Sequence, residues 1–476
     1  METYPERGNH VARKDLGGRV QRGARLARTG LRGATGVAGA TARRWTGRPP
    51  NELQHEQMAE HLAEVFGDMK GAAMKLGQLL SFVDLDVPPE VRTIYHDALA
   101  KLREDAPAFD EDAILGVIEQ EYGAPPDQVF AEFDPVPIAA ASIGQVHAAT
   151  LFDGRDVVVK VQYPGVAEAV RADLRNAESF APLARFLSPN QEIEPLLDEL
   201  RERVDDELDY EHEAQYQRAF ATRYHGHPFI RVPDIIGELC RSRVLVSERI
   251  HGQRFDAFTD AVGEDEKQRV AEIVFRYAFG SIGRFRLFNG DPHPGNYLIE
   301  EQGTASDGGV RVAFLDYGSV KMFTRERAAS MRTVERALSS GDRDAALAAL
   351  RDAGFLPRNA VVDEQVVYDW FRLYTRPVLA EQPFCFTSDY AAEVISSTTD
   401  PRSRYADVLR KLNLPSDYLL LNRIQWGLNS VLARLDACND WRAIRNEYVL
   451  ADAEPATELG ELDAAWWQEH GVAYKR

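Results

Sequence analysis

The sequence predicts an α+β protein made of two lobes with a cleft between them. One observation is a strand-rich region, in which the β-branched runs "IAAASIGQVHAATL", "GRDVVVKVQYPG" and "SRVLVSERIHG" are bounded by Gly and Pro. The other is a mostly helical pattern from Glu264 onward. With 476 residues the chain is too long for one ordinary core, so we expect two or three domains or one bilobal unit with extensions.

Composition restricts the class of protein. No run of 18 uncharged apolar residues occurs and no short apolar segment lies near the N-terminus, so we expect neither a membrane-spanning helix nor a secretory signal. The three cysteines, Cys240, Cys385 and Cys438, are far apart and lack metal-ligand spacing, which favours a reducing compartment. We therefore expect a cytoplasmic protein, with peripheral contact to a membrane as an open alternative.

Residues 1–50 form a predicted basic arm. They contain eleven Lys or Arg against three Asp or Glu, a balance of +8, so the rest of the chain carries −27 within a net charge of −19. An acidic body argues against nucleic-acid binding by that body. The glycines of the arm favour a flexible tail, and contact with anionic lipid is the alternative.

A helical extension is predicted over residues 51–125. From Ala59 to Phe82 the apolar residues fall three or four apart, which is the period of one helix face. The opposite face carries Gly67, Gly71, Lys75 and Gln78. Glycines on one face let another backbone come close, with Lys75 and Gln78 reaching into it. A solvated face with incidental glycines is the alternative.

The strand-rich region, residues 126–250, is the predicted N-lobe. Lys160 ends the run "VVVK", and a lysine that faces a cleft from a strand pairs with phosphate oxygens as a point charge. Gly144, in "IAAASIGQV", permits a turn to lie close over phosphates. The alternatives are an edge lysine that discourages aggregation and an ordinary hairpin turn.

A Pro-free stretch from Leu196 to about Tyr224 is predicted to be helical, and its segment "DDELDYEHEAQ" supplies carboxylates. Asp209 and Glu213 are four apart and share a face, whereas Glu207 lies on a neighbouring side. One of these acids can orient Lys160, and another can bind a metal or meet the lysine of the extension. A solvated acidic helix is the alternative for any one of them.

The predicted C-lobe, residues 251–476, contains the loop "LFNGDPHPGNYLI". Asp291 and Asn296 are five apart, the spacing of the kinase catalytic loop, in which Asp takes the acceptor region and Asn holds a metal. Asp316, in "FLDYGS", follows a hydrophobic strand and matches the Asp-Phe-Gly element, with Tyr317 in place of Phe. Together with the strand lysine upstream, these loops predict phosphoryl transfer.

Two further residues have the chemistry for other roles. No second His or Cys stands at zinc spacing from His293, so we expect His293 to make a loop-bracing hydrogen bond rather than to ligate a metal. Ser142 lacks the G-x-S-x-G context of a hydrolase nucleophile. Near the end of the chain, "YLLLNRIQWGLNSVLARLDA" predicts a buried helix.

These motifs together resemble the UbiB/AarF family of atypical kinases, relatives of the protein-kinase fold. The match rests on "MKLGQLLSF" (a Lys-x-Gly-Gln signature), "AAASIGQVH" (an alanine-rich loop in place of a glycine-rich one), "VVVKVQYPGV", "ELDYEHEA" (a Glu-x-Asp helix), and "DPHPGN" with "LDYGS". They span roughly residues 60–320. The resemblance implies a bilobal protein-kinase-like fold, with Mg-ATP between the lobes and the N-terminal helical extension packed over the active site.

The resemblance also implies roles for single residues. Lys160 meets the phosphates with Glu213 as its partner, Asp291 is the catalytic aspartate, and Asn296 and Asp316 hold Mg²⁺. The predicted nucleotide-binding set is completed by Ala140, Ala141, Ser142 and Gly144 of the alanine-rich loop and by Glu248, which lies outside these motifs.

The extension contributes Lys75 and Gln78 to the implied active site, at the place where a peptide substrate lies in a protein kinase. Glu207 and Asp209 belong to the part of the cleft that faces this helix. The implied cofactors are ATP and Mg²⁺. The implied partners are a nucleotide and an isoprenoid lipid or membrane surface, without nucleic acid, and the oligomeric state is open.

Members of this family are described as ATPases or unorthodox kinases that support quinone and other isoprenoid-lipid metabolism at membranes. Asn289 and Gly290 stand where the family commonly has His-Ala, which motivates the alternative of a nucleotide-gated scaffold or lipid chaperone with negligible turnover. A small-molecule kinase resembling aminoglycoside phosphotransferases ranks last, because those enzymes lack the "KLGQ" helix.

Overall fold

The computed structural model describes residues 111–141, 143–178, 201, 205, 208–301, 303–357, 361–400, 402–409, 411–413, 416–450 and 453–471, without the side chains of residues 173–178 and 416–424. Several predictions fall outside these residues: the basic arm, the helix of Lys75 and Gln78, Ser142 and Glu207. The site described below lies within one compact unit, Phe109–Ala167 together with Leu174–Arg476.

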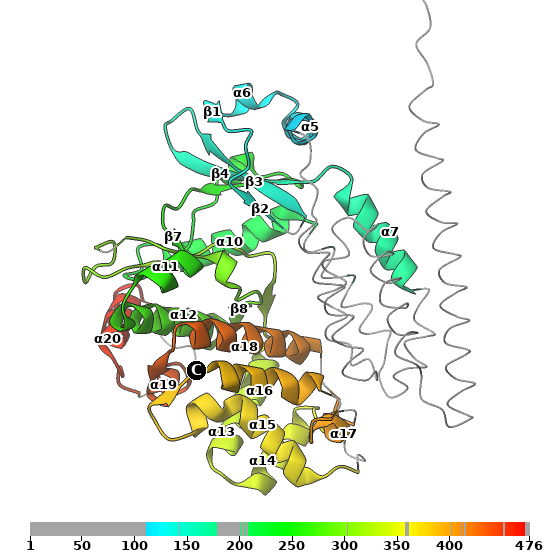
Figure 1. Ribbon diagram of the computed structural model, residues 1–476, viewed down its shortest axis with the longest axis vertical. Coiled ribbons are helices and arrows are strands. Elements are labelled where there is room, and N and C mark those ends of the chain that lie inside the picture. Colours follow the sequence, from blue (N-terminus) through cyan, green and yellow to red (C-terminus); the bar gives the residue numbers. More distant parts are fainter. Residues whose placement is uncertain are drawn as a thin grey trace, which may run out of the picture. The chain divides into compact units, whose positions relative to one another are not determined.

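The N-lobe contains a five-stranded sheet with the strand order β1-β3-β4-β6, in which β2 also pairs with β3. Every pairing in it is antiparallel, and its three longest strands coincide with the β-branched runs of the sequence (Figure 1). The elements from residue 111 to residue 248 are α5 (Glu111–Tyr122), α6 (Pro126–Val129), β1 (Glu132–Phe133), β2 (Ala139–Ala140), β3 (Gly144–Thr150), β4 (Asp156–Gln162), α7 (Val166–Glu178), α10 (Tyr210–Tyr224), β5 (Ile230–Arg231), the 3-10 turn η1 (Gly237–Leu239) and β6 (Val244–Glu248).

Strand β4 determines which way Lys160 faces. Val157, Val159 and Val161 are fully buried on one face of the sheet, where they pack with the apolar residues of α5. Because successive strand residues point to opposite faces, Lys160 projects from the other face. Helix α5, which belongs to the predicted extension, thus covers one face of the sheet and leaves the lysine face to other elements.

Helix α10 begins immediately after Asp209. The carboxylate of Asp209 accepts the backbone N–H groups of Glu211 at 3.0 Å and His212 at 3.3 Å, which makes Asp209 the N-cap. The prediction of an unbroken helix from Leu196 to about Tyr224 is therefore wrong at Leu208 and Asp209, which are not helical. An aspartate favours a helix start there because its side chain pairs with amides that the first turn leaves unsatisfied.

The rest of the chain is mainly helical, as the pattern after Glu264 predicts. Its elements are β7 (Gln253–Arg254), α11 (Phe255–Ala261), α12 (Glu264–Phe285), β8 (Leu287–Asn289), the 3-10 turn η2 (Pro294–Asn296), β9 (Tyr297–Ile299), β10 (Val312–Phe314), β11 (Val320–Met322), α13 (Arg325–Ser339), α14 (Arg343–Asp352), α15 (Glu364–Leu379), β12 (Phe384–Cys385), α16 (Ser388–Thr399), α17 (Ala406–Leu409), α18 (Ser416–Arg434), β13 (Cys438–Asn439), α19 (Trp441–Val449) and α20 (Glu458–Glu469).

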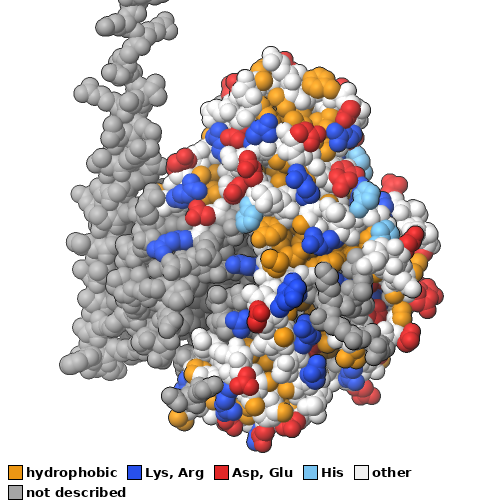
Figure 2. Space-filling view, turned by 180° about the vertical axis from the view of Figure 1, so that it is seen from behind, with side chains coloured by type: hydrophobic (Ala, Val, Ile, Leu, Met, Phe, Trp, Pro, Cys, Tyr) orange, Lys and Arg blue, Asp and Glu red, His pale blue; other side chains and the backbone are white. Residues whose placement is uncertain are grey.

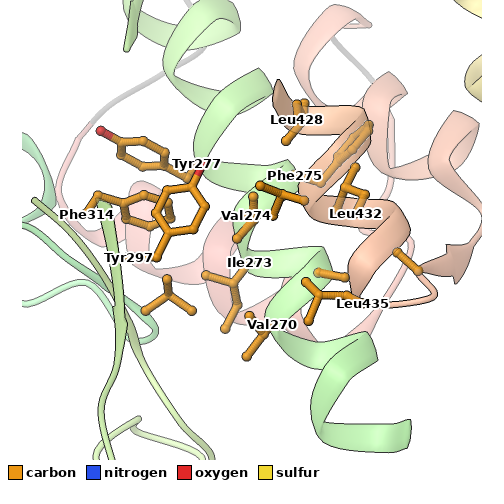
Figure 3. Packing of buried hydrophobic residues seen from close by; sticks show 14 of the residues in the cluster. Val270, Ile273, Val274, Phe275, Tyr277, Tyr297, Phe314, Leu428, Leu432 and Leu435 are labelled. Carbon is orange, nitrogen blue, oxygen red and sulfur yellow. The ribbon is translucent and has the colours of Figure 1, made fainter. Parts of the chain in front are cut away.

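The core of the C-lobe is built around α12. Figure 3 shows its apolar side chains between three leucines, Leu428 and Leu432 of α18 and Leu435 just after it, and the aromatic rings of β9 and β10. The rings of Tyr277 and Phe314 are stacked with their centroids 3.6 Å apart. The predicted burial is confirmed for the later part of this helix, where these leucines are at most 4% exposed, while the side chains of residues 416–424 lie outside the description.

Short strand pairs bring the two predicted phosphate loops together. The loop of Asp291 connects β8 to β9, and the turn of Asp316 connects β10 to β11. Strand β8 pairs with β11, and β9 pairs with β10, both antiparallel. Each strand that flanks one loop is therefore paired with a strand that flanks the other loop. These two pairings hold Asp291 and Asp316 near each other although 25 positions separate them.

Two of the three cysteines form a disulfide. The expectation of a reducing compartment does not predict this bond. Strands β12 and β13 are antiparallel with Cys385 directly opposite Cys438, and the two form a disulfide. Cys240 remains free. The two cysteines are 53 positions apart, and they meet because β12 pairs with β13. Their spacing in the sequence therefore gives no sign of the disulfide.

The surface is mixed in sign. Figure 2 shows one face, on which Lys and Arg side chains are interspersed with Asp and Glu, so the acidic excess of the chain does not make that face uniformly negative. Among the described residues, no helix is both long and apolar enough to cross a membrane.

Candidate active site

Lys160 lies at the centre of a cluster of charged groups. Its Nζ donates to both carboxylate oxygens of Glu213, at 2.8 and 2.9 Å, and lies 4.0 Å from Oδ2 of Asp316. Burial by itself lowers the pKa of Lys160, but the two carboxylates reverse this effect and hold the pKa well above its usual value. The lysine is therefore cationic at neutral pH, which is the form that binds phosphate.

Glu213 reaches Lys160 because it lies on the buried stripe of α10. The other buried residues of this helix are Tyr210, Ala214, Gln217, Phe220, Ala221 and Tyr224. The Glu213 side chain is 4% exposed, and a carboxylate in such a place is costly without a partner. The position of Glu213 on the apolar stripe is thus a sequence signal that distinguishes it from the other acids of the helix. The four-residue spacing between Asp209 and Glu213 does not make this distinction.

Tyr210 is a site residue that the sequence analysis missed. It is fully buried, and the Nζ atom of Lys160 lies over its ring, 4.9 Å from the centroid. An aromatic face attracts a cation, so Tyr210 adds to the attraction that Glu213 supplies. The signal was available, because Tyr210 lies three residues before Glu213 on the same helix face.

The turn that contains Asp316 is fixed by contacts of the Asp316 carboxylate and of the Tyr317 side chain. Oδ1 of Asp316 accepts the backbone N–H of Gly318 at 2.9 Å, while Oδ2 is the oxygen near Lys160. Tyr317, the residue in the Phe position, is fully buried, and its hydroxyl donates to the carbonyl of Phe314 at 3.2 Å. The tyrosine therefore packs as Phe would and satisfies its hydroxyl within the core.

The Asp291 loop is braced by its own side chains. The amide nitrogen of Asn296 donates to the carbonyl of Asp291 at 3.1 Å and to its Oδ2 at 3.2 Å. Nδ1 of His293 accepts the backbone N–H of Gly295 at 3.0 Å, which confirms the predicted bracing hydrogen bond. Asp291 and Asn296 therefore form one rigid pair, as their spacing predicts.

The donor set fits Mg²⁺. The amide nitrogen of Asn296 donates to Asp291, and the amide oxygen is the atom of this side chain that can coordinate a cation. Asp316 supplies carboxylate oxygens, and Mg²⁺ prefers oxygen ligands completed by water and phosphate. Asn296 and Asp316 are therefore suited to hold Mg²⁺ with a nucleotide.

The residues of the alanine-rich loop that were predicted to bind nucleotide have contacts that are explained by strand packing and turn formation. A Cβ added to Gly144 would lie 2.3 Å from the carbonyl oxygen of Val161 and 2.9 Å from the hydroxyl of Tyr210. The glycine is thus needed for strand packing, whether or not it also lies over phosphates. Ala140 ends β2, and the backbone N–H of Ala141 donates to the carbonyl of Gly144 at 2.8 Å, which makes a tight turn.

Two acids of the predicted set serve other partners. The carboxylate of Glu248 accepts hydrogen bonds from the guanidinium of Arg231 and the backbone N–H of Asp234, so its side chain is already engaged. The carboxylate of Asp209 caps α10. The roles of Lys75, Gln78, Ser142 and Glu207 lie outside the described residues and stay predictions.

A family model described as the ABC1 atypical kinase-like domain matches residues 101–350. This range is more than half of the chain and includes every predicted site residue except Lys75 and Gln78. The chain belongs to the ABC1 atypical kinase family. Both the resemblance drawn from the motifs and the protein-kinase-like fold class are thereby confirmed, while the packing of the extension over the site lies outside the described residues.

Named relatives agree with ABC1 family membership. The chain is 31% identical over 317 residues to the atypical kinase COQ8B, mitochondrial, of Rattus norvegicus, which covers 65% of this chain and 58% of the relative. It is 33% identical over 307 residues to the protein Rv0647c of Mycobacterium tuberculosis, covering 62% and 59%. The chain thus spans less than two thirds of the length of these relatives.

A solved structure extends the similarity from sequence to three dimensions. The structure of Rv3197 from Mycobacterium tuberculosis, described as a complex with erythromycin, superimposes with a TM-score of 0.60 at 31% sequence identity. The superposition covers 85% of this chain and 98% of that one.

Proposed function

We propose that this chain binds ATP with Mg²⁺ at the Lys160 cluster and acts as an ATPase or an atypical kinase. The observation that carries the proposal is the ion pair between Lys160 and Glu213 with Asp316 beside it. Protein kinases need a strand lysine paired with a helix glutamate, together with a metal-binding aspartate, before phosphoryl transfer can proceed. Family membership supports the same reading at a coarse level.

Each side chain has a role in this proposal. Lys160 has three N–H donors, of which two point to Glu213, so one is left for a phosphate oxygen. Asn296 and Asp316 would hold Mg²⁺, which neutralises phosphate charge when bound. Asp291 would lie at the acceptor region, held there by the amide of Asn296.

We infer a lipid-linked role as the finer part of the function, with an isoprenoid lipid or quinone precursor as the substrate class. Its support is the motif resemblance, because members of that family act in isoprenoid-lipid metabolism at membranes. Turnover measured with and without liposomes that contain an isoprenoid lipid tests this part. Stimulation specific to the isoprenoid-containing liposomes is expected, and equal rates with liposomes lacking that lipid would remove the substrate assignment.

The scaffold alternative loses part of its motivation. It rested on Asn289 and Gly290 standing where the family commonly has His-Ala. In the structure Asn289 hydrogen-bonds to both phosphate loops, so the loop is braced without the histidine. An active enzyme is therefore the function that the geometry supports best.

Nucleotide binding with and without Mg²⁺ tests the proposal. We expect Mg²⁺ to strengthen ADP and ATP binding, and Asp316→Asn to abolish that metal dependence because one carboxylate ligand is lost. Asp389→Asn, at an exposed aspartate in the first turn of α16, is the matched control and should retain it. Equal nucleotide affinity with and without Mg²⁺ in the unmodified protein would contradict the proposal.

A further inference from the structure

Asn289 hydrogen-bonds to both phosphate loops at once. Its amide nitrogen donates to the backbone carbonyl of Asp316, and its Oδ1 accepts the backbone N–H of Asp291 at 3.1 Å. One side chain therefore joins the loop of Asp291 and Asn296 to the turn of Asp316.

The backbone around Asn289 fixes where this side chain lies. Asn289 is the last residue of β8 and is paired with Val320 of β11. The next residue, Gly290, donates its backbone N–H to the carbonyl of Ser319 at 2.8 Å. The side chain thus starts from a paired strand end and spans the space between the two loops that follow.

We propose that Asn289 is a positioning residue that sets the separation of the two Mg²⁺-ligating side chains, Asn296 and Asp316. This inference rests on the proposed function and adds the residue that aligns its metal site. A primary amide suits the task because it donates at one end and accepts at the other, as the carbonyl of Asp316 and the N–H of Asp291 require.

Metal chemistry explains why alignment matters here. Mg²⁺ demands near-ideal octahedral geometry with short oxygen distances, so two ligands on separate loops must keep a fixed separation. The ligands of this site come from two loops that touch the same amide. Loss of the amide should therefore weaken metal-dependent binding more than nucleotide contacts made without metal.

The test compares Asn289→Ala with Asn289→His in the full-length protein, using ADP with and without Mg²⁺. The alanine removes both hydrogen bonds, so we expect the Mg²⁺-dependent gain in ADP affinity to fall by about tenfold, while the affinity without Mg²⁺ changes by less than about twofold. A neutral imidazole also has one donor and one acceptor, so Asn289→His should restore most of the gain.

Amide hydrogen exchange on the nucleotide-free protein gives a second measurement. The N–H of Asp291 should lose protection in Asn289→Ala, because its acceptor is removed, and regain protection in Asn289→His. This measurement needs neither metal nor nucleotide, so it tests the geometry independently of activity.

Asn439 provides a matched control. Its Oδ1 also accepts the backbone N–H of the adjacent aspartate, Asp440, and its amide nitrogen donates to Glu272, but it lies on β13 in the C-terminal part of the chain. Asn439→Ala should leave the metal dependence unchanged.

The outcomes separate the inference from the function beneath it. If the unmodified protein shows no metal-dependent binding, the proposed function fails and the inference fails with it. If the unmodified protein shows that dependence and Asn289→Ala keeps it, or loses affinity equally with and without Mg²⁺, the positioning role is overturned while the proposed function stands.

Discussion

The Nζ atom of Lys160 lies within 2.9 Å of both carboxylate oxygens of Glu213, although 53 positions separate the two residues in the sequence. Both side chains are largely removed from water, at 16% and 4% exposed. Each charge therefore compensates the desolvation of the other, and neither is well accommodated alone. This relationship links the stability of the N-lobe to the chemistry of the site.

Removing one partner should destabilise the fold. Glu213→Gln leaves the buried ammonium without its main counter-charge, so the free energy of unfolding should fall by about 3 kcal/mol. Urea unfolding measures this change. The double variant Lys160→Met with Glu213→Leu should recover most of the loss, since a buried ion pair can be replaced by apolar side chains at little cost.

Nucleotide affinity should respond differently from stability. The double variant is expected to fold and still to bind no Mg-ATP, because the cation for the phosphates is gone. Normal nucleotide binding by the double variant would show that Lys160 serves stability alone.

Gly427 of α18 packs closely against Pro292 in the Asp291 loop. A Cβ at this position would lie 2.8 Å from Cγ and 2.9 Å from the carbonyl oxygen of Pro292. Gly427→Ala should gain helix propensity but push the loop backbone, with a net loss of about 1–3 kcal/mol in unfolding free energy. It should also weaken the Mg²⁺-dependent gain in nucleotide affinity.

Gly116 is the control for this substitution. It lies within α5, and a Cβ there meets nothing within 4 Å. Gly116→Ala should therefore stabilise the protein by about 1 kcal/mol without a change in affinity. If both alanine variants behave alike, close packing on Pro292 has no consequence for the loop.

Acid should destabilise the protein through His227, which is hydrogen-bonded to Asp463. Burial lowers the pKa of this imidazole, although Asp463 accepts its Nε2–H at 3.0 Å and opposes the shift, and the nearby Arg284 and Arg276 lower the pKa further. Its Nδ1 accepts the backbone N–H of Ile230 at 3.2 Å, so protonation would break that bond.

The sign of the pH effect follows from proton uptake. The unfolded histidine takes up a proton below about pH 6.5 and the folded one does not, so unfolding free energy should fall as pH drops below that value, by at most about 1.4 kcal/mol per pH unit. The pKa of Asp463 is lowered by Arg284 and His227 despite its burial, so this carboxylate stays ionised in that window.

Substitution of His227 isolates the effect. Urea unfolding between pH 5 and pH 8 should give a flatter profile for His227→Gln than for the unmodified protein. The exposed His225, changed in the same way, should leave the profile unaltered. An unchanged profile in His227→Gln would assign the acid sensitivity to other groups.

Sequence reasoning predicted the local elements well where pattern and motif agree. The runs around Lys160 are strands, the segment after Glu264 is mainly helical, and the spacing of Asp291 and Asn296 places both on one braced loop. It failed for the break before α10, because the capping of Asp209 competes with a helical pattern that continues on both sides. It also gave no sign that Cys385 faces Cys438.

By itself, the sequence determined which chemical groups are present and on which kinds of element they stand, since periodicity and turn residues act over a few neighbours. Which groups meet was decided by tertiary structure: Glu213 rather than Asp209 reaches Lys160, Tyr210 lies beneath the ammonium, and Asn289 joins the two loops. The buried stripe of α10 is a local pattern that marks Tyr210 and Glu213. Which residues these side chains meet depends on strand pairing, which joins residues far apart in the chain, so no local pattern contains those contacts.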